Sequence, residues 1–85
     1  MTRRELKHLK AALQFLHDQD GGLVTAPVLH AGMVELLGEN IPLADFRATV
    51  AMLDARGWGT IVPSEFKGAV RKNNPAGEAA LQEMV

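Results

Sequence analysis

The sequence predicts a mainly helical α+β domain, with elements in the order helix, strand, helix, helix, strand, strand, helix. Three observations lead to this prediction. Apolar residues recur at helical spacing in four stretches, and proline or glycine marks most of their ends. The third helical stretch passes through a glycine into a short run that is typical of a strand. At 85 residues, the chain is expected to form one small domain, residues 1–85.

The first predicted helix begins at a capping box and ends near Asp18. In a Thr2–Glu5 box, each side chain accepts a hydrogen bond from the other residue's backbone amide. The Asp-Gln-Asp-Gly-Gly run that starts at Asp18 breaks the pattern. The apolar residues that we expect along the buried face are Leu6, Leu9, Leu13 and Leu16.

A second helix is predicted between Thr25 and Gly38, after a brief extended segment at residues 23–24. Thr25 is a favoured N-cap, Pro27 suits the first turn, and Gly38 suits a left-handed helix end. Only about four residues then precede the next helix, which predicts a helix-turn-helix unit over about residues 25–57. The residues available for packing are Val28, Leu29, Met33, Leu36 and Leu37.

Residues 41–62 are the best-defined stretch of the sequence. Pro42 suits the start of a helix, Arg56 complements the dipole of its last turn, and Gly57 ends it. A helix with one buried stripe that stops at a glycine and enters a strand is typical of the recognition helix of a winged helix-turn-helix domain. The stripe consists of Phe46, Val50 and Leu53, with Ala51 as a further candidate.

The wing is predicted over about residues 58–72, as a two-stranded hairpin with its tip at 63–68. Asn73 and its neighbour stop the returning strand. Pro75 suits the first turn of a last helix over about residues 74–84. Its packing residues are Ala79, Ala80, Leu81 and Met84.

Two sequence motifs carry a family resemblance. The second helix ends in Leu37-Gly38, and the third ends in Leu53-Asp-Ala-Arg-Gly57. With the run VLHAGMVELLGENIPLADFRATVAMLDARGW and the Pro75-Ala-Gly-Glu-Ala-Ala-Leu start of the last helix, they resemble small winged-helix proteins encoded by Mu-like phages and prophages. The resemblance covers about residues 13–81 and implies a DNA-associated or regulatory role. The sequence departs from it at Asn73 and at the Trp58-Gly59 pair.

If the target is double-stranded DNA, exposed residues of the third helix would lie in the major groove. Arg47 is the first candidate, because a guanidinium pairs with O6 and N7 of guanine. Thr49 offers a hydroxyl and a methyl group. The alternative is that Arg47 and Arg56 are ordinary solvated charges. The predicted DNA-binding residues are Asn40, Arg47, Thr49, Arg56, Lys67, Arg71 and Lys72.

The charge of the chain weighs against DNA. Nine Lys and Arg against ten Asp and Glu give a net charge of −1, whereas DNA-binding modules are usually basic. A winged-helix protein–protein module without DNA binding is therefore a second hypothesis. The two differ in whether the predicted cations form one basic face or are screened by Asp45, Asp54 and Glu65. A DNA-binding form would need a partner or a homodimer, with the terminal helix as the surface: Leu81, Met84 and Val85.

Composition argues against several other classes. The chain has no cysteine, which excludes a disulfide framework and a thiolate metal site. No apolar run reaches the roughly 18 residues of a membrane span, and no signal peptide is recognised, so a cytoplasmic protein is expected. His8, His17 and His30 are scattered, and Ser64 stands alone. We expect no enzyme, metal, cofactor or small-molecule substrate.

A degenerate pair of EF-hands is the third hypothesis. Loops at 17–28 and 54–65 would each place an apolar residue two positions after a glycine. Asp54 and Glu65 suit the first and last positions of the second loop, but Arg56 and Trp58 replace oxygen ligands. Such a pair would grip a partner helix without binding calcium tightly.

Overall fold

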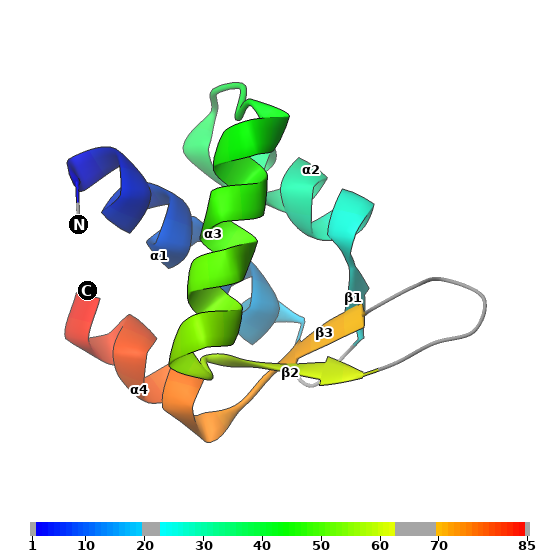
Figure 1. Cartoon of the computed structure of the whole chain (residues 1–85), viewed down its shortest axis with the longest axis vertical. Coiled ribbons are helices and arrows are strands. Elements are labelled where there is room, and N and C mark those ends of the chain that lie inside the picture. Colours follow the sequence, from blue (N-terminus) through cyan, green and yellow to red (C-terminus); the bar gives the residue numbers. More distant parts are fainter. Residues whose placement is uncertain (1, 20–22, 63–69, 85) are drawn as a thin grey trace.

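Four helices and a small antiparallel sheet make up the part of the chain that this computed structural model describes, residues 2–19, 23–62 and 70–84. Their order is the predicted one, and the mainly helical class is confirmed. The predicted hairpin tip at 63–68 lies outside the described residues. Figure 1 shows the elements: α1 (Arg3–Asp18), β1 (Val24–Thr25), α2 (Ala26–Leu37), α3 (Leu43–Arg56), β2 (Gly59–Val62), β3 (Val70–Asn73) and α4 (Pro75–Met84).

The sheet has three strands in the order β1-β3-β2, and both pairs are antiparallel. Thr60 pairs with Lys72 in the predicted hairpin, while Val24 pairs with Arg71 on the other edge of β3. The sequence indicated only a brief extended segment at 23–24. Its pairing holds the residues just before α2 against β3.

Helix α1 packs against all three other helices, α2, α3 and α4, and against β3. Its predicted capping box is present, with Thr2 and Glu5 bonded reciprocally. The prediction that Leu6 belongs to the buried face is wrong, because Leu6 is 43% exposed and His8 is only 4% exposed. Near its N-terminus, α1 turns His8 toward α3. The residues of α1 with no exposed surface are Leu9, Ala12, Leu13 and Leu16.

Two glycines bring elements into close contact. A Cβ atom on Gly32 of α2 would lie 2.2 Å from the Phe15 ring of α1. One on Gly77 of α4 would lie 2.1 Å from the carbonyl oxygen of Trp58. Real Cβ atoms do not approach other atoms so closely, so only glycine permits the observed packing of α1 on α2 and of α4 on the start of the hairpin.

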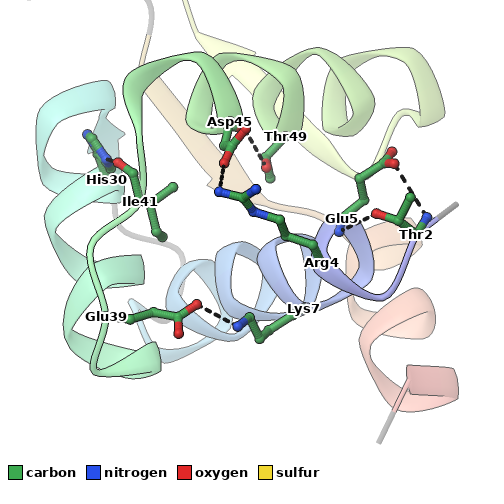
Figure 2. A network of polar contacts seen from close by, with 9 residues as sticks. All are labelled: Thr2, Arg4, Glu5, Lys7, His30, Glu39, Ile41, Asp45 and Thr49. Carbon is green, nitrogen blue, oxygen red and sulfur yellow. Dashed lines mark hydrogen bonds and ion pairs between the residues drawn. The ribbon is translucent and has the colours of Figure 1, made fainter.

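The turn between α2 and α3 has a defined geometry. Gly38 and Gly57 end the two helices with φ of 69° and 67°, as the sequence predicts. Pro42 is the N-cap of α3, so the helix begins one residue later, at Leu43. His30 Nε2 bonds the carbonyl oxygen of Ile41 at 2.7 Å, and the His30 ring stacks on Phe46 with centroids 4.6 Å apart. Figure 2 shows His30 directed at the Ile41 carbonyl group.

Candidate interaction surface

The outward side of α3 presents mostly alanine. Because α3 buries Phe46, Thr49 and Leu53, the opposite side of the helix is exposed. We define the outer face of α3 as Ala44, Arg47, Ala48, Ala51 and Ala55, all of them exposed. Leu43, at the start of the helix, is 52% exposed. This face therefore presents one cation, Arg47, among small apolar side chains.

Thr49 is not available to DNA, and its prediction as a contact residue is wrong. It is 2% exposed, and its hydroxyl donates a hydrogen bond to the backbone oxygen of Asp45 at 2.9 Å. Thr49 follows Phe46 by three residues and precedes Leu53 by four, so it lies on the buried stripe. The sequence already contains that spacing, but Val50, which we expect in the stripe, is only half-buried.

Arg47 and Arg56 do not form one basic face. Both are exposed, but nine residues of α-helix turn through about 900°, which leaves them on opposite sides of α3. The guanidinium carbon of Arg56 lies 5.1 Å from the centre of the Trp58 ring, in a cation–π contact. Only Arg47 projects from the outer face.

The other predicted DNA-binding residues are spread over the molecule. Asn40 is exposed in the α2–α3 turn, beside Arg3, Arg4 and Lys7 of α1. Lys72 is exposed on β3, opposite Thr60. For Arg71 only the backbone pairing is described, and Lys67 and Glu65 lie outside the described residues. The described members of the set therefore do not gather on one surface.

Two carboxylates of the α2–α3 unit bind α1 instead of screening Arg47. Asp45 Oδ2, a buried atom, lies 2.5 Å from the guanidinium of Arg4. Glu39 Oε1 lies 2.5 Å from Lys7 Nζ. The hydrogen bond and the positive charge of Lys7 lower the pKa of Glu39. Figure 2 shows both contacts bridging α1 to the α2–α3 unit.

Charge is divided between these elements. The α2–α3 unit (residues 25–57) holds four carboxylates and two guanidinium groups, a formal charge of −2. Helix α1 holds four cations and two carboxylates, a formal charge of +2. The basic residues of α1 are Arg3, Arg4, Lys7 and Lys10. The α2–α3 unit, which the sequence predicts to contact DNA, is therefore acidic, whereas α1 is basic.

A cluster of polar side chains lies where α1 meets α4, and its hydrogen bonds join α1, β3 and α4 to one another. His17 Nδ1 lies 2.8 Å from both carboxylate oxygens of Glu78, and the Asn73 amide donates to Glu78. Asn74 accepts a hydrogen bond from the Gly77 amide at 2.8 Å, which caps α4. Among the described residues, no group of three His, Cys, Asp or Glu could hold a metal ion.

The EF-hand hypothesis conflicts with the structure at its second loop. Helix α3 continues through Arg56, past the proposed first ligand Asp54. Gly59–Val62 then forms a strand paired with Val70–Asn73. The residues that a calcium loop would use between 54 and 62 are therefore in helix α3, its turn and the sheet.

The terminal helix offers less free surface than predicted. Leu81 is buried, so its prediction as a dimer contact is wrong, and the side chain of Met84 packs partly against the core. Val85 lies outside the described residues. Within the part of the chain that is described, no helix is long and apolar enough to cross a membrane.

Comparisons of the chain with protein-family models, curated proteins and solved structures found no match in any of the three. The class of the protein is therefore the one that its own architecture defines, a small domain of mainly helical structure with an antiparallel sheet.

Proposed function

We propose that the chain is a winged helix-turn-helix domain that acts as a regulatory module through contacts with protein. The fold supports the first half of this proposal in three ways. The element order suits it, β3 lies between β1 and β2 in the sheet, and Gly57 turns the chain from α3 into β2. The positioning helix is then α2, the recognition helix is α3, and the wing is built on β2 and β3.

The proposed contact with protein rests on the composition of the outer face of α3. DNA affinity comes largely from cations that neutralise phosphates, and this face holds one cation, Arg47, among four alanines. The whole α2–α3 unit has a formal charge of −2. The core of a protein interface is depleted in charged residues, and the exposed Leu43 adds a larger apolar side chain to this weakly charged surface.

Binding to double-stranded DNA is the second candidate, and the environment of Arg47 favours it. Arg47 is exposed on the outer face, and the nearby Asp45 carboxylate is held by Arg4 of α1 instead. The wing residues Lys67, Arg71 and Lys72 would supply phosphate contacts. The resemblance to phage winged-helix proteins also supports this candidate.

A titration of duplex DNA at low and moderate salt separates the two candidates. Fluorescence anisotropy of a labelled mixed-sequence duplex would be followed at about 20 and 150 mM salt. The proteins would be the native chain, Arg47→Ala, and the double variant Ala48→Lys/Ala51→Lys. The double variant is the control, because it adds two cations to the same face and replaces only exposed residues.

We expect no binding by the native chain at low salt and measurable, salt-sensitive binding by the double variant. That pair of results would mean that α3 is presented to DNA but lacks the charge to hold it. Low-salt binding by the native chain that Arg47→Ala abolishes would overturn the protein-contact proposal in favour of DNA. Failure of the double variant to bind would remove the support for a recognition-helix geometry.

A further inference from the structure

A groove lies between α1 and α2, on a different surface from the outer face of α3. We define the α1–α2 groove by its lining residues: Lys7, Lys10, Ala11, Gln14, Leu36 and Leu37. Phe15 of α1 packs on Gly32 of α2. Of the lining residues, Lys7, Lys10 and Leu36 are exposed, and Gln14 and Leu37 are half-buried.

The floor of this groove is apolar, and its rim is basic. Leu36 is 47% exposed, and Leu37 and Ala11 lie beside it. Lys10 is exposed at the rim. The methylene chain of a lysine covers apolar surface while its ammonium group stays in water. The α1 side of the groove is therefore both apolar and positively charged.

The charges around the groove leave a positive excess. Lys7 is paired with Glu39 at the end of the groove, as Figure 2 shows. Arg3 lines the depression next to it and, like Lys10, is exposed. The groove and this depression are together lined by four cations and one carboxylate, Glu39, and one of the cations, Arg4, is paired with Asp45. An apolar surface bordered by cations is complementary to a helix that has an apolar face bordered by carboxylates.

We propose that the α1–α2 groove binds an acidic amphipathic helix of a partner protein. An apolar side chain of that helix covers Leu36 and Ala11, and its carboxylates lie against Lys10 and Lys7. Lys7 and Lys10 are three residues apart on α1, so carboxylates one turn apart on the partner match them. This inference rests on the proposed protein-contact function and adds to it a second contact surface, whose partner is an acidic helix.

The test uses a synthetic peptide of about four helical turns, made of glutamate, alanine and leucine with the leucines on one face. Binding to the full chain would be measured by calorimetry and by amide shifts in NMR spectra. Two control peptides replace glutamate by lysine, or leucine by serine. The protein variants would be Lys10→Glu and Leu36→Ser, each with a matched control at an exposed position elsewhere: Lys72→Glu and Leu23→Ser.

We expect the acidic leucine peptide to bind with shifts confined to the residues that line the groove. Lys10→Glu and Leu36→Ser should weaken binding by about five- to tenfold, while the matched controls leave it unchanged. Both control peptides should fail to bind. Unfolding curves for all variants would show that each is folded.

Three outcomes would overturn the inference. The first is an absence of acidic-peptide binding up to about 1 mM, the weakest range that the assay resolves. The second is equal binding of the serine peptide, which would mean that charge alone acts. The third is Lys10-dependent binding to duplex DNA or to phosphatidylserine vesicles without peptide binding. The proposed function fails separately, through the DNA titration of Arg47→Ala.

Discussion

His30 shows how a single side chain can set the geometry of the turn between two helices. Its ring stacks on Phe46 of α3, and its Nε2 atom bonds the carbonyl oxygen of Ile41 in the turn. Ile41 is itself buried. The residue therefore joins α2, the turn and α3 in one contact set. The scattered histidines gave no sign of this role in the sequence, because stacking partners are chosen only when the helices pack.

The pair His30→Phe and His30→Ala separates the two contributions. Phenylalanine keeps the stacking and leaves the Ile41 carbonyl unpaired, so we expect it to lower the free energy of unfolding by about 1–2 kcal/mol. Alanine also removes the ring contact and should lower it by about 2–4 kcal/mol. Urea unfolding followed by circular dichroism measures both. Glu35→Ala, at an exposed position of α2, is the control. Equal losses for the two variants would contradict a role for the stacking.

At the scale of elements, α1 is joined to the acidic α2–α3 unit by charge as well as by apolar packing. Arg4 contacts Asp45, and Lys7 contacts Glu39. Among the residues that the structure describes, no carboxylate forms an ion pair with Arg47. Ion pairs between exposed side chains contribute little stability, so their main effect is to orient the unit and to distribute charge on the surface.

The lowered pKa of Glu39 predicts a pH-dependent effect. A carboxyl group with a lower pKa in the folded state stabilises that state above its unfolded pKa. The contribution falls as the pH drops through the folded pKa. Glu39→Gln should therefore cause a small loss of stability at neutral pH that vanishes in acid, measured by urea unfolding across pH. Glu83→Gln, exposed on α4, is the control. A difference that persists at acidic pH would contradict the cause assigned here, the contact with Lys7.

At the scale of the molecule, one core includes every helix. Leu9, Leu13 and Leu16 of α1 lie in the same buried cluster as residues from the other three helices and from β1. Since β1 pairs with β3, the sheet is fixed to this cluster as well. No helix of the described structure has a separate core.

Unfolding should therefore be a single cooperative transition. Trp58 is half-buried beside the hairpin, so its fluorescence reports that region, while circular dichroism reports the four helices. We expect the two signals to give the same urea midpoint and slope. A hairpin transition at lower urea than the helix transition would disprove a shared core.

Local sequence signals were sufficient for the ends of most helices. The Thr2–Glu5 capping box, Gly38 and Gly57 predicted those ends correctly, because a cap or a left-handed residue acts on its own few neighbours. The same signals did not place Leu6 and Thr49, whose exposure depends on which helix covers each side of α1 and α3. The spacing of hydrophobic residues identifies the side of a helix that is buried. The elements packed against the helix decide which residues lie at the centre of that side.

The sequence by itself thus determined the order and nearly all the bounds of the helices, and its composition determined a net charge of −1. Only the tertiary structure decided how the charged residues are distributed over the surface. It also decided that residues 24–25 pair with β3. Val24 pairs with Arg71, which lies 47 positions later in the sequence. Lys7 bonds Glu39, which lies 32 positions later. Such contacts form only after helix packing has brought distant segments together, so no local pattern could specify them.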